Sequence, residues 1–327
     1  MTLRKLIHIG LPKTGSTFLQ QTIFPALVGD RQLSGFNDPK LLREARRCHH
    51  IGFKDQDFEN FRDCFDSKDE YVHSDESLTG WNFAEVEKKA DLNLRLFGSN
   101  TEVVLFLREP IDWLKSVYLQ ALHQGFVRPP QAFFVRGDYY SQIARGLHPG
   151  DLSLFNLDSF CYRDLVDAYR SRFNHVSVFR FESLRDPSKL ISDLGFDVTE
   201  NFKNKDWLVG NKIANRGYSS IGVSLTLFRE KILNFFGCQS IRIGSFNESF
   251  LVRLAHQSNS LLSKSRKKPS IRGRIFNRVR FECQWRRLIQ KRLDRILPYR
   301  KYVLPAGVIP NNVIEVNEDA YRRLCES

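Results

Sequence analysis

Residues 5–19 read KLIHIGLPKTGSTFL. The first six form an apolar run typical of a buried strand, a tight turn comes next, and an amphipathic helical pattern follows from about Gly15 to Leu27. A turn between a strand and a helix points several backbone N–H groups and the helix N-terminus at one spot, where they bind a phosphate or a similar oxyanion. The stretch therefore predicts a strand, an anion-binding loop and a helix.

The glycine spacing of this loop is that of a nucleotide-triphosphate P-loop, but its lysine is displaced. Gly10 and Gly15 match G-x-x-x-x-G, which in a P-loop continues with Lys and then with a Ser or Thr that holds magnesium. Here Ser16 and Thr17 follow Gly15, and the lysine lies inside the loop as Lys13. The loop thus keeps the backbone cradle for an anion and lacks the usual lysine position.

A second polar group follows another apolar run. Residues 101–107 read TEVVLFL, which predicts a buried strand that ends at Arg108. A helical pattern then covers about 111–124 and carries Ser116 two turns from its start. The planar fork of an arginine suits a phosphate dianion, and a serine hydroxyl adds a further hydrogen bond. The spacing predicts a second anion subsite made by Arg108 and Ser116.

Both motifs resemble the nucleotide-binding segments of PAPS-dependent sulfotransferases of the bacterial type, where PAPS is 3′-phosphoadenosine-5′-phosphosulfate. The loop is similar to the one that holds the 5′-phosphosulfate in that family, and the Arg-Ser pair is similar to its 3′-phosphate site. The resemblance covers roughly residues 3–234 and leaves the middle substrate region unmatched. The cofactor-binding residues that it implies are Pro12, Lys13, Thr14, Gly15, Ser16, Thr17, Arg108 and Ser116.

Two later segments extend the resemblance more weakly. Residues 175–184 read HVSVFRFESL and are similar to a late strand of the family, in which we expect Glu182 to have a structural role. Asn215 and Arg216 precede another helical pattern and resemble a loop that closes over the nucleotide. The resemblance therefore adds these two residues to the cofactor-binding set.

A general base is needed because the acceptor hydroxyl must lose its proton as it attacks. In sulfotransferases this base is a His or a Glu, and a strand pattern here leads into His73, Ser74, Asp75 and Glu76. We expect Glu76 to be the base, with His73 and Asp75 as alternates and Asp38 as an outside candidate. Glu76 could equally be a carboxylate favoured by the dipole at a helix start. By the same resemblance, Lys13 would neutralise charge on the bridging and sulfonate oxygens.

The element pattern predicts a three-layer α/β sandwich with a central parallel sheet, because strands alternate with helices. The resemblance implies the P-loop-NTPase-like fold of the sulfotransferases. Ligands of such sheets bind at the carboxyl ends of the strands. Strands are expected at about 5–10, 70–74, 102–107 and 175–180, and helices at about 15–27, 83–97, 111–124, 159–172, 219–235 and 247–262.

We expect a sulfotransferase domain at residues 1–263 and a basic amphipathic helical extension at residues 264–327. Inside the first domain, about 125–156 is irregular and rich in aromatic residues, Gly and Pro. A long loop beside an active site is usually functional or disordered, so this stretch is interpreted as an acceptor-side lid or as an ordinary structural insertion.

The positive charge of the chain is concentrated near its end. Residues 264–301 contain 15 Lys and Arg and two acidic residues, a surplus of 13 that equals the net charge of the whole 327-residue chain. A basic amphipathic helix suits an anionic membrane surface or an anionic polysaccharide, or it packs on the catalytic domain by its apolar face. Nucleic acid is disfavoured because no recognised binding fold accompanies the charge. The residues of the apolar face are Phe281, Trp285, Leu288, Ile289, Leu293 and Ile296.

Compartment and cofactor class are bounded by what the sequence lacks. No apolar run approaches the roughly 20 residues of a membrane span, and no signal peptide precedes the first strand. The six cysteines show no C-x-x-C pair, and no spacing typical of metal ligands occurs. We therefore expect a cytoplasmic enzyme with reduced thiols and no metal, in peripheral contact with an anionic membrane through residues 264–301.

The patterns together predict a sulfotransferase that moves the sulfuryl group of PAPS to a hydroxyl or an amine. The acceptor would be a carbohydrate, a glycolipid or a polysaccharide, and the product adenosine 3′,5′-bisphosphate (PAP). One alternative is a small-molecule kinase with a variant P-loop, which would bind ATP with magnesium. The other is a non-catalytic protein that binds polyanions.

Overall fold

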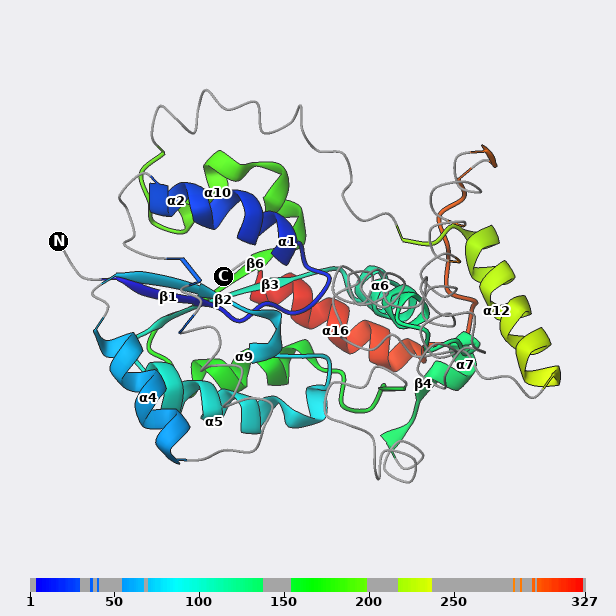
Figure 1. Cartoon of the computed structure of the whole chain (residues 1–327), viewed down its shortest axis with the longest axis horizontal. Helices are drawn as coiled ribbons and strands as arrows, with labels where there is room; N and C mark the ends of the chain where they lie inside the picture. The colour runs from blue at the N-terminus through cyan, green and yellow to red at the C-terminus, as the bar shows by residue number, and fades with distance from the viewer. Residues whose placement is uncertain are drawn as a thin grey trace, which may run out of the picture.

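A four-stranded parallel sheet with helices on both faces forms the centre of the computed structural model (Figure 1). The strands lie in the order β2 (Tyr71–Ser74), β1 (Lys5–His8), β3 (Glu102–Leu107) and β6 (Val176–Arg180). The structure describes residues 4–29, 36–37, 40, 55–67, 70–137, 154–198, 217–236, 285, 289, 296–297 and 299–325. The α/β class with a central parallel sheet is thereby confirmed.

Three strands, β2 at the edge of the sheet and β1 and β3 inside it, are buried on both faces because helices cover both. In β1 and β3 every residue after the first is buried, and β2 is buried throughout. β1 lies between β2 and β3 and pairs with both. After β1 the chain forms β2 on one side of it and then crosses over to form β3 on the other side. Ligand crevices of open parallel sheets lie at such a switch point, outside the carboxyl ends of the strands.

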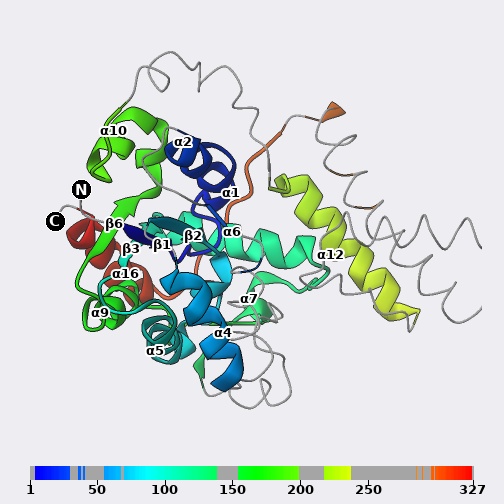
Figure 2. The same ribbon diagram turned by 60° about the vertical axis from the view of Figure 1, so that its left-hand side comes forward.

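One face of the sheet is covered by the helix that follows β1. This helix is built from α1 (Ser16–Phe18), a π-helical turn (Leu19–Ile23) and α2 (Phe24–Gly29), and α10 (Pro187–Asp193) lies beside it (Figures 1 and 2). Their apolar side chains form one core cluster with strand residues such as Val72 and Phe106.

The opposite face is covered by α4 (Asp55–Asp66), α5 (Val86–Phe97), α9 (Tyr162–Arg170) and α16 (Asn311–Leu324) (Figures 1 and 2). The helices α6 (Pro110–His123), α7 (Pro130–Phe133) and α12 (Ser220–Phe235) lie to one side of the sheet, with the short parallel pair β4 (Phe134–Val135) and β5 (Phe155–Asn156). The layers are those of a three-layer sandwich.

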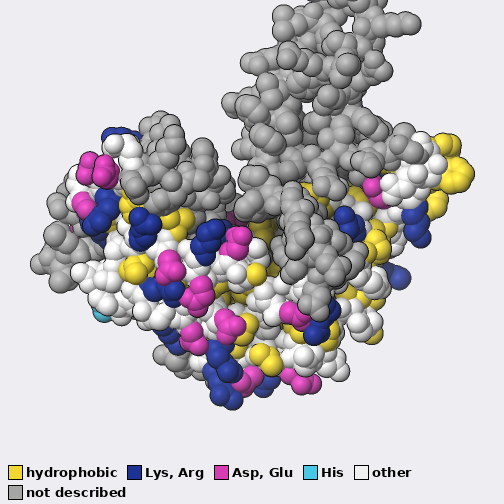
Figure 3. Space-filling model, turned by 90° about the horizontal axis from the view of Figure 1, so that it is seen from below, with side chains coloured by type: hydrophobic (Ala, Val, Ile, Leu, Met, Phe, Trp, Pro, Cys, Tyr) yellow, Lys and Arg dark blue, Asp and Glu magenta, His cyan; other side chains and the backbone are white. Residues whose placement is uncertain are grey.

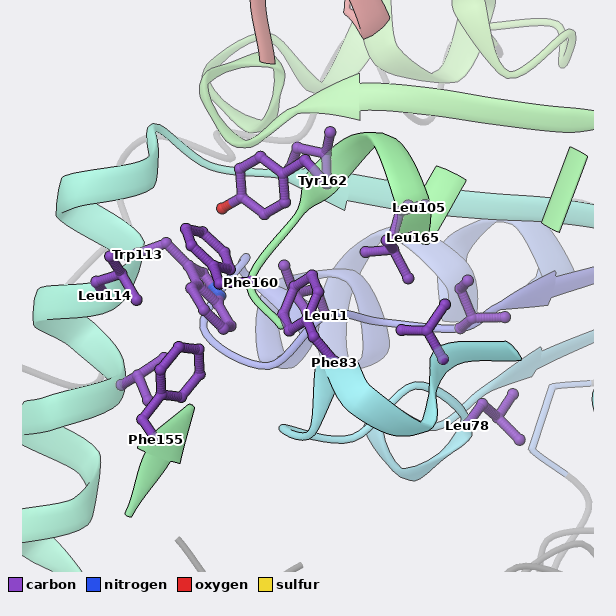
Figure 4. Packing of buried hydrophobic residues seen from close by; sticks show 14 of the residues in the cluster. Leu11, Leu78, Phe83, Leu105, Trp113, Leu114, Phe155, Phe160, Tyr162 and Leu165 are labelled. Atoms are coloured by element: carbon purple, nitrogen blue, oxygen red, sulfur yellow. The ribbon is translucent and has the colours of Figure 1, made fainter. Parts of the chain in front are cut away.

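An aromatic cluster joins α6 to the segment that leads into α9. The rings of Trp113 and Phe160 stack at a centroid distance of 5.2 Å, and Phe83, Phe155 and Tyr162 surround them (Figure 4). All five are buried. Large rings dominate core energetics, and each contributes about 1.5–3 kcal/mol when fully buried. This cluster fixes α6 relative to the sheet.

The predicted strands and five of the predicted helices are found within a few residues of their expected bounds, and the helix expected at 247–262 lies outside the described residues. The helices α4, α7, α10 and α16 were not predicted, nor were the short strands β4 and β5, which lie in the stretch expected to be irregular. The domain boundary after residue 263 stays a prediction, since residues 237–284 are not described. The last part of the expected extension nevertheless belongs to the main core, because Val313 and Leu324 of α16 are buried in it.

The described ends of the predicted lid also belong to this core. Phe126, Phe133 and Phe134 are buried, so these rings pack inside the protein and are not available to an acceptor. Residues 138–153 lie outside the described part. Of the six cysteines, Cys64, Cys161 and Cys325 are described, and Cys64 and Cys161 are free thiols.

Asn317 fastens α16 to the rest of the fold. Its side-chain oxygen accepts a hydrogen bond from the backbone N–H of Tyr162 at 2.8 Å, and its amide nitrogen donates to the carbonyl oxygens of Phe160 and Val313, both at 2.9 Å. The residue is buried. These bonds satisfy the start of α9, whose first N–H groups have no partner within the helix.

We predict that Asn317→Ala lowers the free energy of unfolding by about 1–3 kcal/mol, because it leaves buried polar groups without partners. Urea unfolding followed by circular dichroism would measure the loss. The control is Glu315→Ala, an exposed position on the same helix, which should change stability by less than about 0.5 kcal/mol. Equal stability of the two variants would contradict the idea that α16 is part of the main folding unit.

Candidate active site

The loop between β1 and α1 has a left-handed backbone at three of its positions. The φ angles are 48° at Gly10, 70° at Lys13 and 87° at Gly15. The left-handed backbone at Gly15 favours glycine, and a side chain there would also have to displace Leu184 Cδ1. Lys13 is not a glycine, and a left-handed residue of this kind costs roughly 1–2 kcal/mol. Such strain clusters at functional sites, where the surrounding structure holds it in place.

Side chains from α6 and from the loop itself hold this conformation. Trp113 Nε1 donates to the carbonyl oxygen of Pro12 at 2.8 Å. Thr14 Oγ1 donates to the carbonyl oxygen of Leu11 at 2.5 Å, and Thr14 is fully buried. Pro12 and Thr14 therefore shape the loop, whereas the exposed Thr17 stands at the start of α1.

The predicted pair Arg108 and Ser116 is brought together by the start of α6. Arg108 Nη1 donates to Ser116 Oγ at 3.0 Å, and Ser116 Oγ donates to the carbonyl oxygen of Asp112 at 2.8 Å. The eight-residue spacing lets Arg108, which precedes α6, reach Ser116 almost two turns into the helix. Glu109 caps this helix by accepting from two of its first N–H groups.

Arg108 also connects the two motifs. Its Nη1 donates to the carbonyl oxygen of Lys13 at 3.4 Å, and its Cζ lies 4.7 Å from the ring centroid of Phe181. The Tyr162 hydroxyl donates to the Arg108 backbone carbonyl at 2.8 Å. Phe181 also packs against Gly15. The anion loop, the arginine and the serine thus form one continuous site.

Glu76 lies against this site at the start of the 3₁₀ helix η2 (Glu76–Leu78). A Cβ at Gly10 would lie 3.4 Å from Glu76 Cα, so the loop passes directly beside this residue. Burial raises the pKa of the Glu76 carboxyl above its ordinary value, against the opposing effects of the Ser16 hydroxyl and the Lys13 charge. A carboxyl whose pKa is raised, next to a lysine and the loop after β1, suits proton transfer.

The Ser16 hydroxyl is one polar atom of the site that the fold leaves without a full hydrogen bond. It is buried and has no well-aligned partner among the described residues, although it lies close enough to Glu76 to lower the pKa of that carboxyl. Buried hydroxyls are normally bonded, so an orphaned one at a helix start fits an anion that binds there.

The alternates for the base are placed differently. His73 faces the α5 side of the sheet, where its ring lies 5.4 Å from that of Phe97 and 6.3 Å from that of Tyr71, so it is a core residue. Asp75 accepts from the backbone N–H of Ser77 and caps η2. Asp38 lies outside the described residues.

The late loop with Asn215 and Arg216 also lies outside the described part. The next residue, Gly217, is described and meets α6, since a Cβ there would lie 2.8 Å from Leu119 Cδ1. The chain therefore arrives next to α6 three residues beyond Ser116. Glu182, expected to be structural, accepts a hydrogen bond from the Tyr321 hydroxyl at 2.7 Å.

Several residues of the site could not be recognised in the sequence. Trp113, Tyr162 and Phe181 hold or cover the predicted groups, yet only their place in the fold reveals this.

An ion pair lies beside Arg108, and the sequence does indicate it, because Asp112 and Lys115 are three residues apart on a helix. Lys301 Nζ also lies 3.5 Å from Asp112 Oδ1. Burial would raise the pKa of Asp112, but both lysines and Arg108 hold it below the usual value. The cluster leaves a positive surplus beside Arg108.

Within the described ranges, no group of three or more His, Cys, Asp or Glu residues could hold a metal ion. The helices in the same ranges are all too short or too polar to cross a lipid bilayer. No protein-family model, no curated protein and no solved structure matches this chain.

A buried histidine, His8, lies directly beside Gly10 of the loop. His8 is fully buried, and its Nδ1 lies 2.7 Å from Ser74 Oγ. Its Cε1 would be 3.1 Å from a Cβ at Gly10. Burial lowers the pKa of His8 to about 3, because the charged imidazolium would lose its hydration.

We predict that His8 makes stability depend on pH. The folded state keeps His8 neutral, whereas the unfolded chain binds a proton below pH 6.5, so this contribution is complete above 6.5 and is lost as pH falls toward about 3. Relative to His8→Gln, the wild type should lose about 1.4 kcal/mol of its free energy of unfolding per pH unit below 6.5. Urea titrations from pH 7 to 4.5 would measure the difference. The control is His175→Gln, which changes an exposed histidine. If the stability difference between the wild type and His8→Gln varies with pH no more than the difference between the wild type and His175→Gln, the assignment is refuted.

Proposed function

We propose that this chain is a sulfotransferase that moves the sulfuryl group of PAPS to a hydroxyl or an amine of an acceptor. The observation that carries the proposal is the position of Arg108, whose guanidinium bonds both to Ser116 Oγ and to the Lys13 carbonyl. The two motifs that resemble the 5′-phosphosulfate loop and the 3′-phosphate site of the family therefore meet in one place. A kinase P-loop does not call for this second subsite.

The residues of the site fit a ligand with two phosphate-like ends. The N–H groups at the start of α1 and the hydroxyls of Ser16 and Thr17 would hold the 5′-phosphate, since the first N–H groups of a helix lack internal partners. Arg108 and Ser116 would hold the 3′-phosphate. PAPS, when bound, supplies the sulfuryl group and leaves as PAP.

Lys13 and Glu76 would carry the chemistry at the transferred group. The acceptor O–H loses its proton to the Glu76 carboxylate, a new O–S bond forms, and the S–O bond to the 5′-phosphate breaks. Lys13 stabilises the charge that develops on the departing oxygen, which is the main requirement of such transfers. Lys13 lies inside the loop, at a position where the backbone is left-handed.

The acceptor class stays a prediction. A carbohydrate, in polymeric or lipid-linked form, was expected from the aromatic-rich stretch and from the basic segment. The described rings of that stretch are buried, so the preference now rests on the charge of residues 264–301. The cytoplasmic location and the absence of a metal requirement are likewise proposals.

The first test is calorimetric titration with PAP in the presence of a chelator. We predict binding by the wild type and a loss of about 10- to 100-fold in affinity for Arg108→Ala, because a charge-assisted bond contributes about 1.5–3 kcal/mol. Arg163→Ala, which removes an exposed arginine on α9, is the matched control and should bind as the wild type does.

Other outcomes would replace the proposal. Binding of ATP with magnesium, without binding of PAP, would indicate the kinase. No binding of either nucleotide would favour a non-catalytic protein that binds polyanions.

The second test addresses the base. We predict that Glu76→Gln lowers kcat for conversion of PAPS to PAP by about 10²–10⁴-fold and leaves PAP affinity nearly unchanged. Water or an added hydroxyl compound serves as acceptor. Since burial raises the pKa of Glu76, the acidic limb of the wild-type profile should lie at a higher pH than an exposed glutamate would give. Asp75→Asn keeps the cap of η2 and is the control. A large loss in Asp75→Asn with none in Glu76→Gln would transfer the role to Asp75.

A further inference from the structure

α12 carries a row of exposed apolar side chains along one face. Phe228, Ile232 and Phe235 follow the spacing i, i+4, i+7, which places them on the same side of a helix. Their exposed fractions are 60%, 42% and 85%, and Phe236, directly after the helix, is 71% exposed. Figure 3 shows hydrophobic side chains gathered at the right-hand end of the molecule, where α12 lies in Figure 1. A contiguous exposed group of large apolar residues marks an interaction site.

The opposite face of α12 is already used for packing. Val223 is buried against the main core, and Ile289 fits closely over Gly222, where a Cβ would lie 2.8 Å from Ile289 Cγ2. Thr226 is buried on this face as well. Packing against the core therefore accounts for the apolar residues on one face of α12. It does not account for Phe228, Ile232 and Phe235, which are exposed.

Two residues of the basic segment contact the same helix. Trp285 Nε1 lies 3.3 Å from Thr226 Oγ1, and Arg229 of α12 stacks over the Trp285 ring at 5.1 Å. Together with Ile289, this tryptophan belongs to residues 264–301, the part of the chain that carries its entire surplus of positive charge. Two of the six residues of the expected apolar face thus contact α12, and Arg286 and Arg287 directly follow one of them, Trp285, in the sequence.

We propose that the exposed row of α12 docks on an anionic lipid surface. Exposed phenylalanines beside a strongly basic segment are the combination that binds the interface of such membranes, by apolar insertion and by attraction to acidic headgroups. Lys231 lies exposed on the helix between Phe228 and Ile232. A second copy of the chain is the poorer occupant, because two surfaces with the same large positive charge would repel each other. Protein interfaces in general are depleted of lysine.

The test is flotation of the full chain with two kinds of vesicles. We expect the wild type to float with vesicles that contain 30% phosphatidylserine in phosphatidylcholine, and to bind pure phosphatidylcholine far more weakly. The double variant Phe235→Ser/Phe236→Ser should lose binding about tenfold or more, because two large apolar side chains no longer enter the interface. Val316→Ser removes a half-exposed apolar residue of α16 and should bind as the wild type does.

Controls separate this proposal from others. Thermal unfolding of the double variant should match the wild type, since both residues are exposed, and Phe228→Ser offers a second variant if it does not. Equal flotation of the wild type and the double variant, or no flotation of the wild type, would overturn the proposal. A dimer in sedimentation equilibrium that the double variant abolishes would assign the row to a second copy. Vesicle binding needs no cofactor, so it is independent of the proposed sulfotransferase activity.

Discussion

The guanidinium of Arg108 is the contact on which the candidate site depends. It leaves the carboxyl end of β3, bonds to Ser116 on α6 and reaches back to the Lys13 carbonyl in the loop after β1. Two adjacent strands of a parallel sheet end at the same edge, so one side chain can span both loops. Phe181 covers its face and Tyr162 fixes its backbone, which means that the arginine is held before any ligand binds. Preorganised charge of this kind needs little rearrangement during a reaction.

The loop after β1 has a strained backbone at Lys13. Lys13 adopts a left-handed backbone that an ordinary residue avoids, and the bonds from Trp113 and Arg108 to the neighbouring carbonyls stabilise it. The Glu76 carboxyl beside this loop is subject to two opposing effects on its pKa. Burial favours its protonated form, while Lys13 favours its charged form, and burial has the larger effect. A lysine and a carboxyl whose environments oppose one another are suited to divide charge stabilisation and proton transfer between them.

Much of this could be predicted because it is local. An apolar run, two glycines five residues apart and an arginine eight residues before a serine define the strands, the loop and the subsite within short windows of sequence. The face of His73 could not be predicted, because β2 is buried on both sides and shows no alternation. α16 was missed for a related reason: the polar Asn317 interrupts its apolar stripe, and its hydrogen-bond partner Tyr162 lies 155 residues away. Only the three-dimensional fold identifies Asn317 as a core residue.

The end of the chain contributes to the environment of the loop at its beginning. Tyr321 on α16 donates to Glu182 in the 3₁₀ helix η4 (Phe181–Arg185), and Phe181 and Leu184 of the same helix press on Gly15. A bond near the C-terminus is thereby connected through packed side chains to the glycine that starts α1. Contacts between such distant segments form only after long stretches of chain have been ordered, which is slow and entropically costly. The loop after β1 therefore has its local shape encoded in residues 5–19, but its contacts with Phe181 and Leu184 form only when the sheet and the last helix are both in place.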